Sequence, residues 1–193
     1  AALAAVPTAV ASRAVRRGLR MLLHPYAGDL GDATAVLAVA AGEVPAASIS
    51  TGLMAAREGP WVTIHRPGAP PPAAEVAIPV PGEVMFGRWL FQADRVEAAP
   101  LPSLSRRVLA LPSGHSELVV RSARPGDTIA MGEGSKSVVD ALREAGVPIR
   151  LRTVWPVVEE AGRMVWVIGT RQAAGAAAEP GSPATILRAR EAV

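Results

Sequence analysis

The residues best suited to chemistry lie between Arg121 and Arg171, around a glycine-containing turn. Gly134, Ser135 and Lys136 come just before a short amphipathic segment, and Lys136 is the only lysine among 20 basic residues. Backbone amides of a turn or a helix N-terminus, together with a hydroxyl and an ammonium, form a good binding site for anions such as phosphate. The sequence therefore predicts an anion site at this turn.

This turn does not match the nucleotide-binding P-loop. That loop needs Gly-Lys-Ser/Thr, with another glycine five residues before the first of these positions. Here Ser135 separates Gly134 from Lys136, and Ile129 occupies the place of the other glycine. We therefore expect no ATP binding on this turn.

Four arginines are expected close to the turn. Arg121 and Arg124 precede a tight Pro-Gly-Asp turn, whereas Arg150 and Arg152 lie two residues apart on a segment expected to be extended. Alternate residues of an extended segment project from one face, so Arg150 and Arg152 should point the same way. The four arginines and Lys136, gathered around one helix N-terminus, would form a surface that binds phosphates. The pattern leaves open a second interpretation, a solvated surface whose arginines pair with Glu133, Glu144, Glu159 and Glu160.

Composition argues against several other kinds of site. The chain has no cysteine, and its three histidines are far apart, without the spacing of metal ligands: His24, His65 and His115. His65 alternates with apolar neighbours and is interpreted as a structural or solvent-facing residue rather than a base. No carboxylate pair or Ser-His-Asp order stands out. No apolar run approaches the roughly 20 residues of a membrane span.

The first helix is expected over residues 6–23, with Pro7 in its first turn. At 100° per residue, Val15, Leu19 and Leu22 lie on one face and four arginines lie on the opposite face. No acidic residue precedes Asp29, so these arginines have no local partner. The face is either solvated or a surface for phosphates or a neighbouring domain. Its arginines are Arg13, Arg16, Arg17 and Arg20.

Local signals place the other elements. A second helix should begin at Asp29 or Asp32 and end before Gly42. Another short helix should begin with a capping box of Ser137 and Asp140 and end at Gly146. This helix should bury a stripe formed by Val138, Leu142 and Ala145. Trp89 and Phe91 should share a core-facing side of a strand. The expected strands are 48–51, 61–65, 76–80, 85–92, 107–111 and 118–122, with a turn at 57–60 and a final edge strand over 185–188.

These elements predict an α+β fold, a small helical N-terminal part followed by a small, mostly antiparallel β-rich domain that carries one short helix. The Pro-rich run PGAPPP marks the linker. The expected divisions are a helical domain ending in a β-hairpin over 1–66, the linker over 67–75, the β-rich domain over 76–172 and a loose tail over 173–193.

Several motifs in the second half resemble one protein family. Their order and spacing over about fifty residues are similar to the C-terminal domain of bacterial tRNA(Ile)-lysidine synthetases, and the first part resembles that family's central substrate-binding domain. The motifs are RPGD (124–127), Gly132, GSK (134–136), Pro148, Arg150, Arg152, WP (155–156) and WVxGxR (166–171).

The resemblance implies a specific activity. The family ligates lysine to C2 of the wobble cytidine of isoleucine tRNA with ATP, in an N-terminal ATP-pyrophosphatase domain that carries an SGGxDS loop. This sequence contains no such loop and begins without Met, so we expect an inactive segment of a longer cytoplasmic carbon–nitrogen ligase that itself holds no cofactor. ATP and Mg would belong to the parent enzyme. The implied partners are tRNA and the N-terminal domain, with no membrane, and a homodimer is left open.

The resemblance assigns tRNA binding to the positions already singled out. They are Arg121, Arg124, Gly134, Ser135, Lys136, Arg150, Arg152, Arg13, Arg16, Arg17 and Arg20. The chain departs from the family at Ser137, where a second lysine is common, at Ala141-Leu142, where an aromatic residue is common, and at 111–114, where an acidic turn is common. Two other hypotheses are a protein–protein or interdomain scaffold and, more remotely, a small-anion enzyme.

Overall fold

The computed structural model describes residues 3–101, 106–114 and 117–192, so His115 lies outside the described residues. The chain separates into two compact units, Ala1–Gly68 and Ala69–Val193. The division falls inside the stretch expected to be the linker. Each unit is described by itself.

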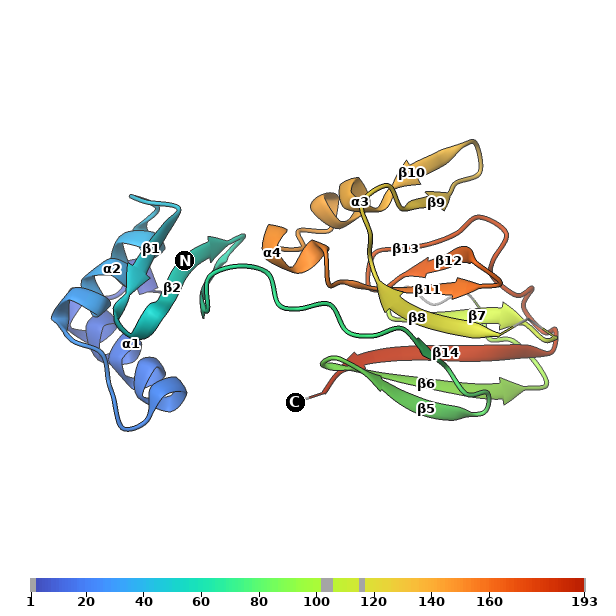
Figure 1. The fold of residues 1–193 in the computed structure, drawn as a ribbon, viewed down its shortest axis with the longest axis horizontal. Helices are drawn as coiled ribbons and strands as arrows, with labels where there is room; N and C mark the ends of the chain where they lie inside the picture. The colour runs from blue at the N-terminus through green and yellow to red at the C-terminus, as the bar shows by residue number, and fades with distance from the viewer. Residues whose placement is uncertain (1–2, 102–105, 115–116, 193) are drawn as a thin grey trace. The chain divides into compact units, whose positions relative to one another are not determined.

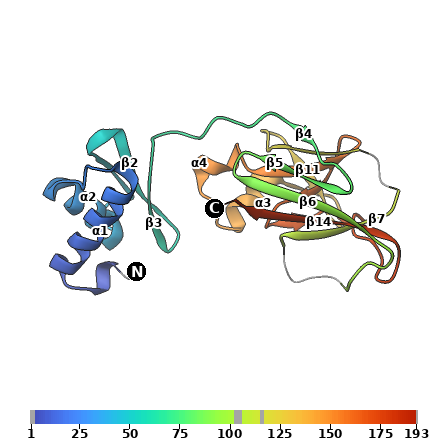
Figure 2. The same cartoon turned by 90° about the horizontal axis from the view of Figure 1, so that it is seen from below.

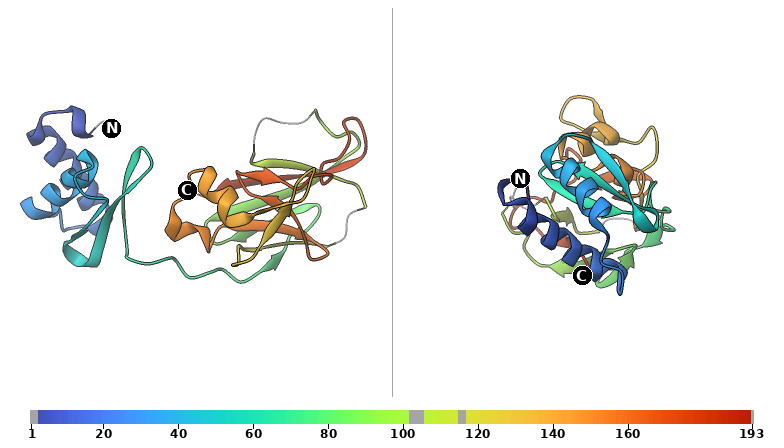
Figure 3. Two further views of the ribbon diagram at one scale, coloured as in Figure 1. Left: turned by 90° about the horizontal axis from the view of Figure 1, so that it is seen from above. Right: turned by 90° about the vertical axis from the view of Figure 1, so that its left-hand side faces the viewer.

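Unit 1 combines two helices with a small antiparallel sheet, which has the order β1-β2-β3 (Figure 3). Its core joins Val15 and Leu19 of the first helix to Val36 and Val39 of the second helix and to Ala55 of the sheet. The elements are η1 (Leu3–Ala5), α1 (Thr8–Leu23), α2 (Leu30–Ala41), β1 (Ala46–Ile49), η2 (Ser50–Gly52), β2 (Leu53–Glu58) and β3 (Trp61–His65).

The ends of α2 follow from local chemistry, as the sequence predicted. The Asp29 carboxylate accepts the amide of Asp32, and the Asp32 carboxylate accepts the amide of Asp29, which closes a capping box. Gly42 ends the helix in the left-handed conformation that glycine adopts without a steric cost. Asp32 also accepts the Tyr26 hydroxyl at 2.8 Å and the Ser50 amide at 2.7 Å, so it joins α2 to both neighbouring loops.

Two predictions for unit 1 need correction. Leu22 is 61% exposed, because the buried residues of α1 follow an i, i+4 row through Ala11, Val15 and Leu19, and it is Leu23 that packs against the core. A turn occurs within the expected range 57–60 but consists of Gly59 and Pro60, because Arg57 and Glu58 belong to β2, a strand that the sequence interpretation missed.

Unit 2 is built around two packed sheets, of orders β13-β12-β11-β8-β4 and β5-β6-β14-β7 (Figures 1 and 2). Every strand pairing is antiparallel among the described residues. The strands of these sheets are β4 (Val76–Ala77), β5 (Gly82–Phe86), β6 (Trp89–Val96), β7 (Val108–Pro112), β8 (Leu118–Ser122), β11 (Pro156–Glu160), β12 (Arg163–Val167), β13 (Arg171–Gln172) and β14 (Ala184–Glu191).

The main core of unit 2 lies between the two sheets. Trp89 and Phe91 are buried there, as predicted, together with Trp166 and Leu187. Trp155 meets Trp89 edge to face, with ring centroids 5.3 Å apart. This core uses a few large aromatic side chains to fill the space between strands that are otherwise rich in Val, Leu and Ala.

A third layer covers the other face of the five-stranded sheet. It consists of a small hairpin, β9 (Thr128–Ala130) and β10 (Ser135–Ser137), followed by α3 (Val138–Glu144) and α4 (Ile149–Arg152). Val138, Leu142 and Leu151 of these helices join Val157 of β11 in a second core. The α+β class is therefore confirmed, with two short helices in unit 2 where one was expected.

Three further expectations for unit 2 are wrong. The single strand expected over 85–92 is a hairpin, β5 and β6, with its turn at 87–88. The edge strand expected over 185–188 is β14, an eight-residue strand that pairs with both β6 and β7 in the middle of its sheet. The end of the tail that was expected to be loose therefore lies in the middle of a sheet, and its pairing partners are distant in sequence.

No helix among the described residues is long and apolar enough to cross a membrane.

Candidate nucleic-acid interface

One side of α1 carries a surface of unpaired positive charge. Arg13, Arg16, Arg17 and Arg20 are all exposed, and within the described part of the chain none of them makes an ion pair or a side-chain hydrogen bond. The opposite side of the helix is buried against the core of unit 1. Folding therefore turns the arginine face of α1 toward solvent and brings no described carboxylate to it.

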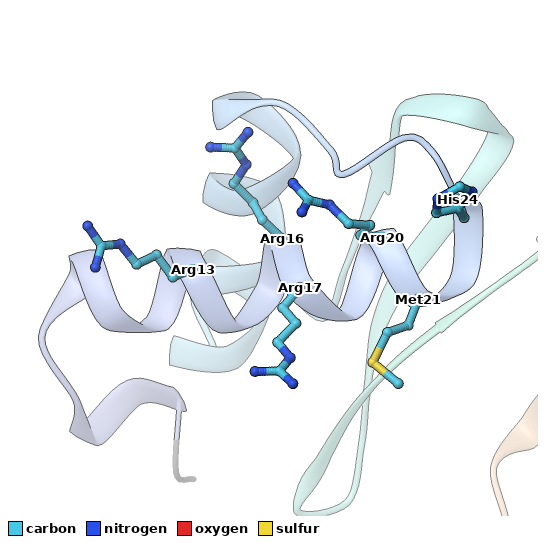
Figure 4. Close-up of a pocket in the computed structure, with 6 residues that line it drawn as sticks. All are labelled: Arg13, Arg16, Arg17, Arg20, Met21 and His24. Carbon is cyan, nitrogen blue, oxygen red and sulfur yellow. The ribbon is translucent and has the colours of Figure 1, made fainter.

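The four arginines are spread around the exposed half of the helix. Arg13, Arg16 and Arg20 point to one side in Figure 4, whereas Arg17 points to the other. Together with Met21 and His24 they line an open hollow of about 770 Å³. Exposed guanidinium groups along one helix suit contacts with successive phosphates of a nucleic acid backbone rather than the enclosure of one small molecule.

Arg121 is not on the surface, which corrects the expectation that it faces a ligand. Its side chain is 6% exposed. It donates to both carboxylate oxygens of Asp127, at 2.8 and 2.9 Å, and to the Ser122 carbonyl at 2.9 Å, and it also contacts Glu159. The guanidinium thus joins β8 to the RPGD turn and to β11. It is a structural group in this fold.

The ion pair of Arg121 and Asp127 shifts the pKa of both partners in favour of their charged forms. Burial would raise the pKa of Asp127, but the hydrogen bonds from Arg121 and from the Arg124 amide, with the charges of both arginines, hold that pKa below its usual value. The hydrogen bond to Asp127 raises the pKa of Arg121 further above its already high value. The pair therefore remains ionised over the neutral range.

The other predicted site arginines of unit 2, Arg124, Arg150 and Arg152, do not converge on Lys136. Arg124 is exposed and pairs with Glu75 at 2.9 Å. Arg150 and Arg152 lie on the helical turn α4, not on an extended segment, because the chain turns immediately after Pro148. Arg152 donates its Nε to the Val147 carbonyl at 2.9 Å. Arg150 lines an apolar pocket of about 250 Å³ that also includes Arg88, Trp89 and Trp155.

The glycine turn differs from the predicted anion site. Gly134 closes the β9–β10 hairpin with a φ of +77°, and Ser135 and Lys136 lie on β10. The first amide of α3, that of Val138, donates to the Asp127 carbonyl at 2.9 Å. Ser137 makes no capping bond, so the predicted capping box is absent. Lys136 Nζ donates to Glu144 at 2.6 Å.

The predicted stripe of α3 is also only partly right. Val138 and Leu142 are buried, but Ala141 is buried in place of Ala145, while Gly146 ends the helix as predicted with a φ of +75°. Arg171 of the WVxGxR motif was not predicted as a site residue, although its Nη1 lies 3.5 Å from the Met131 sulfur in the turn before Lys136. No described group of three or more His, Cys, Asp or Glu residues is arranged to hold a metal ion.

Comparison with known proteins identifies the class of the second unit. Residues 118–188 match the family described as "TilS substrate C-terminal domain". A solved structure described as "Crystal structure of TILS C-terminal domain" superposes with a TM-score of 0.54 at 26% identity, over 61% of this chain and 98% of that one. Most of the second unit is therefore similar in sequence and fold to the TilS C-terminal domain.

Curated relatives name the corresponding enzyme. The tRNA(Ile)-lysidine synthases of two strains of Thermus thermophilus are each 43% identical to this chain over 61 residues. The aligned region covers 32% of this chain and 11% of the length of each relative. The chain is thus related to the C-terminal part of tRNA(Ile)-lysidine synthase, as its motifs predicted.

Proposed function

We propose that this chain binds tRNA and acts as a non-catalytic part of a tRNA(Ile)-lysidine synthase in the cytoplasm. The relationship of unit 2 to the TilS C-terminal domain supplies the context. The observation that carries the proposal is the arginine face of α1, where four exposed guanidinium groups have no carboxylate partner among the described residues. Lysine ligation, with its ATP and Mg, belongs to the N-terminal ATP-pyrophosphatase domain under this proposal.

Contacts made by this face would follow the phosphate backbone. Arginines on a helix read the position of phosphates and the shape of a stem more than the identity of bases. Each phosphate neutralised releases counterions, so affinity falls steeply with salt. The first 28 residues contain no acidic residue, which keeps a negatively charged ligand free of local repulsion.

The test compares two double variants of equal charge. Arg16→Gln with Arg20→Gln removes two unpaired arginines, whereas Arg88→Gln with Arg188→Gln removes two arginines that are paired with Glu191 and Asp94. Glutamine retains helix propensity, so α1 should persist. Binding of tRNA is measured by fluorescence anisotropy at several salt concentrations.

The α1 variant should weaken binding and reduce the slope of log affinity against log salt by about two, because each phosphate contact contributes about 0.9. The matched variant should change the slope by less, since its arginines are already neutralised. Equal effects of the two variants would contradict the role of α1. The isolated chain, supplied with ATP, lysine and tRNA, should form no lysidine.

The alternative function is a scaffold that docks an acidic protein domain. The observation that favours it is the pair of exposed apolar side chains, Val10 and Met21, on the same helix as the arginines. This function requires no affinity for tRNA. Absence of a tRNA complex at low salt, with no salt-dependent signal, would support the scaffold and refute the proposal.

A further inference from the structure

Glu144 is an exposed carboxylate in a positively charged region of unit 2. Its Oε2 accepts from Lys136 Nζ at 2.6 Å, although the two residues belong to different elements, α3 and β10. Arg143 precedes it in the helix and pairs with Asp140 at 3.0 Å. The hydrogen bond from Lys136 is the largest cause of a lowered pKa for Glu144, and the charges of Lys136, Arg171 and Arg143 act in the same direction against desolvation.

Arg171 brings a third cation to this region from another layer. Its Nη1 lies 3.5 Å from the Met131 sulfur in the β9–β10 turn, and the Ala174 amide donates to the Ala130 carbonyl at 3.0 Å, so β13 and the turn are held together. Within the described residues Arg171 has no carboxylate partner, and its buried Nε has no hydrogen-bond partner. Its hydrogen-bonding capacity is largely unused.

We propose that Lys136, Arg171 and Arg143 form a binding site for one backbone phosphate of RNA, and that the Glu144 carboxylate occupies this site until the phosphate displaces it. The inference rests on the proposed function and adds that the Glu144 carboxylate competes with the RNA phosphate for the same cations. Carboxylate and phosphate oxygens accept the same ammonium and guanidinium donors. The Lys136 and Glu144 side chains are 26% and 52% exposed, so water screens their ion pair and the glutamate can move aside at little cost.

If the Glu144 carboxylate competes with the phosphate, its removal should raise the affinity for RNA. Glu144→Gln should tighten binding of a short RNA hairpin by about two- to fivefold at low salt, the range expected when one exposed ion pair no longer competes. The salt slope should rise by about one, for one additional phosphate contact. Lys136→Gln and Arg171→Gln should each weaken binding and lower the slope.

A matched control separates release of Lys136 from a general gain of positive charge. Glu133 lies in the same β9–β10 turn, is exposed and makes no ion pair among the described residues. Glu133→Gln changes the net charge by the same amount as Glu144→Gln. Its effect on binding should be clearly smaller.

A direct observation is available because Lys136 is the only lysine of the chain. Labelling with [13Cε,15Nζ]lysine gives one side-chain signal, which reports the ion pair without assignment. The signal should shift in Glu144→Gln, and the RNA hairpin or inorganic phosphate should move it at lower concentration in that variant than in the parent protein.

Equal RNA affinities of Glu144→Gln and Glu133→Gln would overturn the inference. A Lys136 signal that responds to neither RNA nor phosphate would overturn it as well. If the α1 variant loses RNA binding while the Lys136 signal stays fixed, the proposed function stands and this site fails. If no form of the protein binds RNA but phosphate moves the Lys136 signal more readily in Glu144→Gln, the proposed function fails and the competing carboxylate is upheld.

Discussion

The buried guanidinium of Arg121 should be a major source of stability in unit 2. Replacing it with Met removes the cation but fills a similar volume with an apolar side chain. Asp127, whose side chain is 12% exposed, then loses two hydrogen bonds and its counter-charge, and Glu159 loses its cation as well. Removal of one partner of a buried ion pair costs about 3–5 kcal/mol, so Arg121→Met should lower the free energy of unfolding by that amount.

The exposed pair beside it provides the control. Arg124 and Glu75 form an ion pair of similar length, 2.9 Å, but their side chains are 61% and 60% exposed. Water already screens that pair, so Arg124→Met should cost about 1 kcal/mol or less. Arg121→Lys keeps the charge but loses the planar fork that reaches both oxygens of Asp127, and it should fall between the two.

Tryptophan emission can report unit 2 alone. Trp61 belongs to unit 1 and is exposed, whereas the other tryptophans, Trp89, Trp155 and Trp166, belong to unit 2. In a Trp61→Phe background, urea unfolding followed by fluorescence therefore measures the second unit. A loss of less than about 1 kcal/mol for Arg121→Met would refute the structural role, because that value is typical of an exposed pair.

The same variant should change the response to acid. The folded-state pKa of Asp127 is depressed, so its contribution to stability is complete above the unfolded pKa of about 3.9 and is lost as pH falls through the folded pKa. The stability difference between parent and Arg121→Met should therefore be largest at neutral pH and shrink below about pH 4. A difference that stays constant down to acid pH would show that Asp127 is not held by Arg121.

Three further predictions concern other parts of the fold. Asp32→Ala removes acceptors for the Tyr26 hydroxyl and the Ser50 amide, and should destabilise unit 1 by about 2–4 kcal/mol in thermal unfolding followed by circular dichroism. Ser137→Ala should change stability by less than about 0.5 kcal/mol in urea, since this side chain makes no capping bond; a loss near 1 kcal/mol would reveal a cap. Leu187→Ala, in the centre of β14, should cost about 2–5 kcal/mol, and a neutral effect would contradict a central strand.

Elements whose signals are local were predictable from the sequence. The start of α2 at Asp29 and its end at Gly42 depend on side chains and backbone angles within a few residues, and so does the end of α3 at Gly146. Strand β14 could not be placed in the same way. Its position depends on pairing with β6, about ninety residues earlier in sequence, and with β7. An Ala- and Arg-containing run gives no indication of whether it lies at an edge or in the centre of a sheet.

The same distinction separates the arginines of the candidate site. Arg121 has two carboxylate partners: Asp127 lies only six residues away, whereas Glu159 is remote in sequence and is brought close by the pairing of β8 with β11. Lys136 likewise meets a carboxylate, Glu144, through the turn from β10 into α3. The sequence named Glu144 and Glu159 among the possible counter-charges, but only the fold shows which cation each of them meets.

The arginines of α1 are different because their environment is local. The helix period places them opposite Val15 and Leu19, and no acidic residue occurs before Asp29, so the sequence alone predicted a face of arginines without local partners. No described acidic residue pairs with any of the four arginines, so folding leaves this face positively charged. Cations left unpaired by both sequence and fold are the ones available to a polyanion. Hence α1, rather than the glycine turn, should carry most of the salt-dependent affinity for tRNA.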